Sequence, residues 1–255
     1  MLLEKSQLKK RSKVSQILAG VLVNALYEMK NYPIVLFNTV LSPLSILLLI
    51  VFVSQGRLIG QAVIGGLILT MFQSGMALQT DLAHLKNDFK LQDMIVASPT
   101  NWLTYIVGLA IGDIIYSLPA LVVLGVLAYY FLPISIIGAV ELIAVLLLMF
   151  LVSMAIGYAL STYSSDIVQS FAFSRLLSTL FSTIPPVYYP IALIPFPYRY
   201  LAYLSPTTYA AELAQNAAGY VSPTLTNIIL DWGILVILTV VLFIIAATKA
   251  RWREV

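Results

Sequence analysis

Charged side chains are scarce in this chain, and residues 81–101 hold an unusual share of them. Three aspartates, two lysines and the only histidine, His84, lie between positions 81 and 93. A lone histidine outside the apolar runs, with no clustered ligands, suits neither nucleophilic catalysis nor metal binding. We therefore predict no catalytic, cofactor-binding or metal-binding residue, and no enzyme activity for the chain by itself.

The same segment has helical order. Leu82, Leu85, Phe89 and Val96 can share one face of a helix, and Ser98-Pro99 would end it, because the residue before a proline avoids the helical region. Long apolar runs flank the segment. We predict a short helix that docks onto a partner; the alternative is a solvated loop that only connects its neighbours.

Four ionisable residues lie inside apolar runs: Asp113, Glu141, Arg175 and Asp231. A charge at membrane depth is costly, so such groups pair, extend toward the interface, or face water. We expect pairing or extension more than direct substrate contact. One hypothesis pairs Asp113 with Arg175; the alternative is that Asp113 faces a wet path.

These residues need membrane-spanning helices to position them. The chain is 60% hydrophobic and 10% charged, against about 25% charged in ordinary soluble domains. Its apolar runs are long enough to cross a bilayer and do not alternate as barrel strands do. The absence of cysteine excludes disulfides and thiolate zinc sites. We predict an all-α membrane protein, one domain over 1–255, with six spans at 33–54, 58–80, 102–132, 135–160, 169–194 and 224–248.

The N-terminal 32 residues form a basic leader and a helix. Val14, Leu18, Leu22 and Met29 follow a helical period between positions 14 and 29, which favours a helix lying in the membrane interface. A soluble stub or an extension of the first span is the alternative. Lys and Arg gather near both ends and in 81–101. The positive-inside rule then predicts that both termini and 81–101 are cytoplasmic.

An outer hairpin is predicted over 185–223. Prolines lack the amide donor of a helix, so the cluster that begins with Pro185-Pro186 should break the fifth span. Ser205-Pro206 resembles a capped helix start, and Gly219 can end that helix. The segment is too short to span, which favours a re-entrant or interfacial hairpin. Its candidate residues are Pro185, Pro186, Tyr188, Tyr189, Pro206, Tyr209 and Glu212.

Taken in order, these features resemble the permease subunits of type-two ATP-binding-cassette exporters. The loop ends in Asp93-Met94-Ile95-Val96-Ala97-Ser98-Pro99, where the family often has Gly-Thr-Leu-Glu-x-Leu-Leu-x-Ser/Thr-Pro. Leu204-Ser205-Pro206-Thr207-Thr208-Tyr209 is similar to the Asn/Ser-Pro-x-Thr-Tyr-like element of the family. The chain departs from the first motif at Lys90-Leu91-Gln92, and Asp93 replaces Glu.

The resemblance implies a permease dimer, with identical or different chains, and a separate cytoplasmic ATPase that binds ATP and Mg²⁺. The docking helix would be the coupling helix, with ATPase contacts at Leu85, Asp88, Phe89, Leu91, Asp93 and Met94. This chain has no Gly-x-x-x-x-Gly-Lys-Ser/Thr loop of its own for nucleotide. The implied partners are the ATPase, a second permease and membrane lipid, with no nucleic acid.

We expect a multi-pass cell-membrane protein that moves a lipid, a lipid-linked glycan or an amphipathic small molecule outward by alternating access. The alternative is a six-span secondary transporter or channel that works without an ATPase. The substrate is not identified by the residues.

Overall fold

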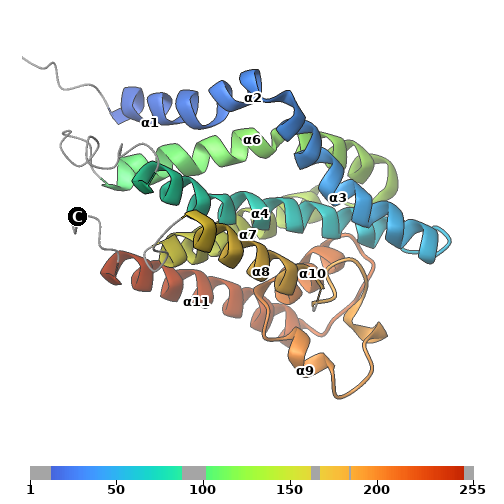
Figure 1. Ribbon diagram of the computed structural model, residues 1–255. Coiled ribbons are helices and arrows are strands. Elements are labelled where there is room, and N and C mark those ends of the chain that lie inside the picture. Colours follow the sequence, from blue (N-terminus) through green and yellow to red (C-terminus); the bar gives the residue numbers. More distant parts are fainter. Residues whose placement is uncertain (1–12, 88–101, 162–166, 184, 250–255) are drawn as a thin grey trace, which may run out of the picture.

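A computed structural model describes residues 13–87, 102–161, 167–183 and 185–249. Every regular element in these ranges is helical (Figure 1). In chain order they are α1 (Lys13–Val21), the π-helical η1 (Leu22–Leu26), α2 (Tyr27–Asn31), α3 (Pro33–Val53), α4 (Ile59–Asn87), α6 (Trp102–Phe131), α7 (Ile136–Ser161), α8 (Ile167–Thr183), the 3-10 turn η2 (Ile191–Leu193), α9 (Arg199–Ala202), α10 (Pro206–Ala217) and α11 (Leu225–Lys249).

Five of the described helices are long and apolar enough to cross a membrane: α3, α4, α6, α7 and α11. They match five of the predicted spans to within a few residues, apart from the far end of α4. The remaining predicted span, 169–194, corresponds to α8, which has 17 residues and a more polar sequence. α8 ends at Thr183, so the predicted end at 194 is wrong; Pro185 and Pro186 follow and cannot donate helical hydrogen bonds. The six-span count stays a prediction.

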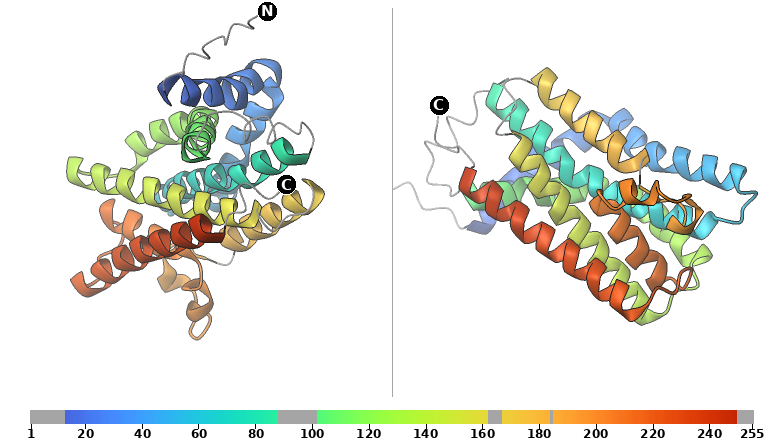
Figure 2. Two further views of the ribbon diagram at one scale, coloured as in Figure 1. Left: turned by 90° about the vertical axis from the view of Figure 1, so that its left-hand side faces the viewer. Right: turned by 90° about the horizontal axis from the view of Figure 1, so that it is seen from below.

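α4 is the central helix of the bundle. It packs against α3, α6, α7, α8 and α10, and Figures 1 and 2 show it enclosed by them. Of its span, 89% is buried, against 11% for α3 and 17% for α11. α4 is therefore core, whereas α3 and α11 turn most of their apolar surface outward, as lipid-facing helices do.

The backbones of α4 and α7 approach each other closely. A Cβ at Gly75 would lie 2.6 Å from the carbonyl oxygen of Phe150 and 2.7 Å from the amide nitrogen of Met154. Gly157 of α7 lies opposite, where a Cβ would be 3.2 Å from the carbonyl oxygen of Gly75. Small residues let two membrane helices pack backbone to backbone in this way.

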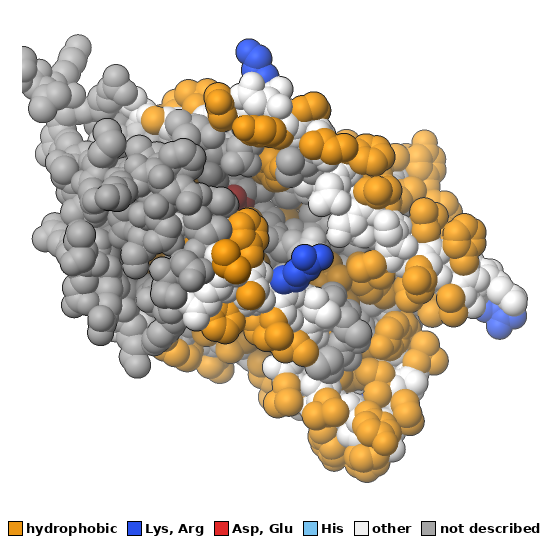
Figure 3. Space-filling view, viewed as in Figure 1, with side chains coloured by type: hydrophobic (Ala, Val, Ile, Leu, Met, Phe, Trp, Pro, Cys, Tyr) orange, Lys and Arg blue, Asp and Glu red, His pale blue; other side chains and the backbone are white. Residues whose placement is uncertain are grey.

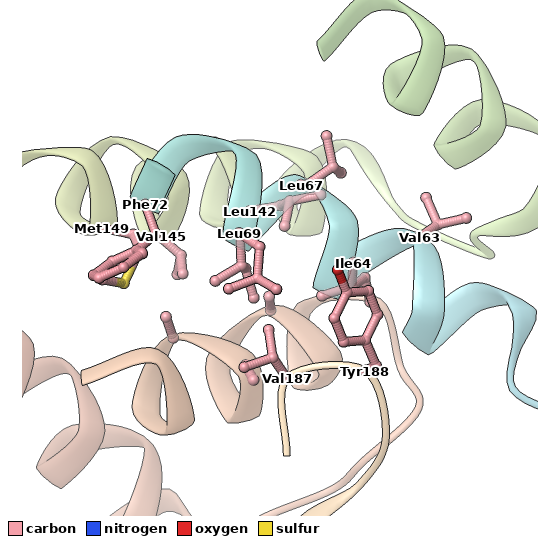
Figure 4. Close-up of a cluster of buried hydrophobic side chains, with 14 of the residues drawn as sticks. Val63, Ile64, Leu67, Leu69, Phe72, Leu142, Val145, Met149, Val187 and Tyr188 are labelled. Atoms are coloured by element: carbon pink, nitrogen blue, oxygen red, sulfur yellow. The ribbon is translucent and has the colours of Figure 1, made fainter. Parts of the chain in front are cut away.

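Apolar side chains fill the rest of the space around α4. Phe72 of α4 lies near Met149 and Val145 of α7, and Ile64 of α4 lies near Tyr188, which follows α8 (Figure 4). Leu69 and Val187 belong to the same cluster. The outer surface is also largely apolar (Figure 3), with Lys and Arg side chains few and far apart on the face shown. An apolar core and an apolar surface together are the signature of a membrane protein.

The predicted N-terminal helix is confirmed, and it runs from Lys13 to Asn31 through the π-helical turn. It packs on α6, where Gly20 and Gly108 meet: a Cβ on Gly20 would be 3.4 Å from the Gly108 backbone. Val14, Leu18 and Leu22 are exposed on the other side. This apolar stripe fits the interface, and that position stays a prediction.

The span predicted to end at residue 80 and the first residues of the predicted cytoplasmic segment form one helix. Residues 81–87 continue α4 without a break, because nothing before Asn87 removes a helical hydrogen bond. Residues 88–101 lie outside the described residues. α6 begins at Trp102, as predicted.

The segment between α8 and α11 contains the helix predicted after Ser205. The Ser205 side chain accepts from the Thr207 amide at 3.3 Å, and Pro206 occupies the first turn of α10. Gly219 has φ +76° just after α10, a left-handed conformation that ends helices. Both predictions of helix boundaries are therefore confirmed.

Candidate functional site

One of the predicted ATPase contacts lies within the described residues. Leu85 lies in the last turns of α4. Asp88, Phe89, Leu91, Asp93 and Met94 lie outside the described residues. What the structure adds is the element behind them, since residues 88–101 continue directly from the most buried helix of the bundle.

A hydrogen-bonded link joins α4 to α8 near this end. The amide of Gln79 donates to the Ser170 carbonyl at 3.1 Å and accepts from the Ser174 hydroxyl at 2.8 Å. The Ser170 hydroxyl donates to the Gln79 carbonyl at 3.2 Å. Gln79 is fully buried. Three bonds in an apolar setting fix α8 against α4, and no sequence prediction named these residues.

The four intramembrane charges are distributed over different environments. Asp113 in α6 and Asp231 in α11 are buried, whereas Glu141 and Arg175 are exposed. Asp113 and Arg175 lie on helices separated by α4 (Figure 1). The structure thus does not bring the hypothesised pair together.

Acidic and phenolic groups meet where α10 packs on α11. The Tyr203 hydroxyl donates to Glu212 at 3.4 Å, and the Tyr209 hydroxyl donates to the Tyr203 carbonyl at 2.8 Å. Burial first and the Asp231 charge second raise the pKa of Glu212, the Tyr203 hydrogen bond opposes the change, and the resulting pKa is about 7. Glu212 therefore titrates near neutral pH.

The predicted hairpin residues pack onto the bundle. Pro185, Pro186 and Tyr188 are buried, and Tyr189 is half-buried. The Gln215 amide donates to the Tyr189 carbonyl at 3.4 Å, and the Thr207 hydroxyl of α10 donates to the Phe181 carbonyl of α8 at 3.0 Å. α10 and the end of α8 are thereby joined to each other and to α4.

Within the ranges that the structure describes, no three His, Asp or Glu side chains lie close enough to hold a metal ion. The described part of the chain thus has a central helix, α4, with a polar link to α8 toward its Asn87 end and the segment 185–219 packed toward its other end.

A family model described as ABC-2 type transporter matches residues 17–218 of the chain. The match begins in α1 and ends just after α10, so it includes α4, α8 and the hairpin helix. No curated protein matches the chain.

Proposed function

We infer, because the chain belongs to the ABC-2 type transporter family, that it is the membrane-spanning subunit of an ATP-driven exporter. Permeases of this family are transport subunits that work with a cytoplasmic ATPase subunit. The exporting direction and the substrate are our proposal. The observation that carries it is α4, a single helix that joins residues 88–101 to the centre of the bundle.

The proposed mechanism begins at the ATPase. Leu85, Asp88, Phe89, Leu91, Asp93 and Met94 would contact it, and ATP with Mg²⁺ would bind on that partner. A displacement at the Asn87 end of α4 is passed to α8 through the Gln79 link and to α7 through the Gly75 contact. Alternating access requires that the helices of the bundle can pack in two different arrangements.

The rest of the assembly follows from the same proposal. Two permeases, identical or different, enclose the path for a lipid, a lipid-linked glycan or an amphipathic small molecule. The exposed surfaces of α3 and α11 leave room for lipid and for a second copy. Six spans, with α8 as the fifth and a re-entrant hairpin before α11, put both termini in the cytoplasm.

The test is Phe89→Asp in the permease co-expressed with its ATPase. A charge placed in an apolar contact costs several kcal/mol, so we expect loss of co-purification and of ATP-dependent transport, with normal membrane insertion. Ser222→Asp is the matched control, because Ser222 is exposed in the loop before α11.

Normal co-purification and transport by Phe89→Asp would refute the docking role. Transport that persists without any ATPase or ATP would instead support the secondary transporter and overturn the proposed function.

A further inference from the structure

α4 is buried on every side but one. Between positions 61 and 79, Gln73 is the single exposed residue, and Ala77 and Thr80 on the same face are half-exposed. Spacings of four and seven residues place these three in one stripe. The central helix therefore presents two polar side chains, Gln73 and Thr80, with the small Ala77 between them, on its open side.

α8 presents a matching polar flank. Ser174 contacts Gln79, and Phe72 packs edge-on against Phe181 at 5.3 Å, so the two helices run antiparallel with 175 level with about 77. Gln73 directly follows the contact residue Phe72 in α4, and Arg175 directly follows the contact residue Ser174 in α8. Each step along a helix turns the side chain by about 100°. Because the two helices are antiparallel, these turns have opposite senses when viewed from one end, and both side chains therefore point to the same side of the α4–α8 pair.

The open side is a groove with α4 as its floor and α3 and α8 as its walls. Both helices pack on α4, and Figures 1 and 3 show this face, where a Lys or Arg side chain lies between apolar regions. We call it the α3–α8 groove and define it by Gln73, Thr80, Arg175 and Thr179. Thr179, also exposed, donates to the Arg175 carbonyl at 2.9 Å.

Arg175 lies within the apolar zone. The Gln79 link beside it is four residues inside the end of the α4 span at Ala83. An exposed guanidinium at this depth is costly against lipid tails. Within the described ranges Arg175 takes part in no ion pair. A guanidinium in this position extends toward the interface or meets water or an anion, and the open side of α4 has room for water or an anion beside it.

We propose that the α3–α8 groove receives the phosphate head group of a lipid substrate, with Arg175 as its anion-binding residue. The inference rests on the proposed function and narrows its substrate class. A guanidinium donates two parallel hydrogen bonds to phosphate oxygens. α3, which is apolar and has few fully buried residues, provides a surface for the lipid chains. The groove opens toward the surrounding membrane, from which a lipid can enter directly, and this favours a lipid over a free ion as the ligand.

The experiment measures binding by the purified permease in detergent, without the ATPase. The probes are dioleoylphosphatidic acid, dioleoylphosphatidylcholine and inorganic phosphate, read by native mass spectrometry and by thermal shift. We expect phosphatidic acid to bind best. Arg175→Gln should weaken phosphatidic acid binding at least about tenfold, because it removes both charge-assisted hydrogen bonds. Arg175→Lys should retain part of the affinity.

Arg57→Gln is the control, because Arg57 is an exposed cation in the loop between α3 and α4, away from the groove. Equal phosphatidic acid binding by the wild-type protein and Arg175→Gln overturns the proposal. So does inorganic phosphate that competes as well as the lipid, since it assigns the site to a free anion. If Arg175→Gln changes the proportion of dimer in native mass spectra but not lipid binding, Arg175 acts in the contact with a second permease. That result also overturns the proposal. Because no ATPase is present, these results are independent of the Phe89→Asp test.

Discussion

The contact between α4 and α7 predicts a large effect from one methyl group. Gly75→Ala would place its Cβ against the Ser153 hydroxyl and 2.6 Å and 2.7 Å from the backbone atoms of Phe150 and Met154. A hydroxyl can rotate away, but backbone inside α7 cannot. The helices must separate, and α4 is packed by other helices on its remaining sides.

Inserting a methyl group into a packed core costs roughly 1–3 kcal/mol, and two backbone contacts point to the upper end. Gly125→Ala is the matched control, since a Cβ on this α6 glycine has no atom within 4 Å. Replacing a helical glycine by alanine then gains up to about 1 kcal/mol. We expect the two variants to differ by roughly 3 kcal/mol or more in free energy of unfolding.

The assay is thermal unfolding of the purified permease in one detergent. For a chain of this size, such a difference corresponds to at least about 6 °C in Tm. Gly75→Ala combined with Ser153→Ala should stay destabilised, because the Phe150 carbonyl remains in place. Equal Tm values for the Gly75 and Gly125 variants would refute the argument, and full rescue by Ser153→Ala would show that the hydroxyl alone was the obstacle.

Three further outcomes are expected. A double-mutant cycle of Gln79→Leu and Ser174→Ala in thermal unfolding should show a coupling of about 0.6–1.7 kcal/mol, and additive effects would mean that the link does not form. The pKa of Glu212, about 7 against 4.5, gives stability that is present below about pH 4.5 and is lost as pH rises through about 7. Solvent screening reduces this contribution to the free energy of unfolding to about 1 kcal/mol, and Glu212→Gln should make the slope in stability measured from pH 5 to 8 shallower. Single cysteines at Arg57 and Arg199 should react with an impermeant thiol reagent added outside cells, and protection of both would invert the proposed topology.

The sequence predicted helix positions well because each boundary has a local cause. The apolar runs gave five spans, and the caps at Ser205 and Gly219 gave α10. The proline pair gave the break after α8, although the predicted end of that span was too late by a few turns. These signals act over a few residues, within the range that pattern reasoning covers.

The missed features depend on residues far apart in the chain. Gln79 and Ser170 are 91 positions apart, and nothing near either one indicates the other. Depth estimated from helical rise placed Asp113 and Arg175 inside the membrane but did not fix the direction in which each points. The three-dimensional arrangement put Asp113 in the interior and Arg175 on an open groove.

The burial of α4 has a mechanical consequence. At 29 residues it is about 44 Å long, and neighbours on nearly every side leave it no room to bend or swing alone. A displacement of one end of α4 along the helix axis is therefore expected to move the other end by nearly the same distance. Flexing must then occur in the outer helices, where α3 contains Pro43 and α6 contains Pro119. We therefore expect a conformational change of this permease to occur by bending of the outer helices, while α4 keeps a constant length.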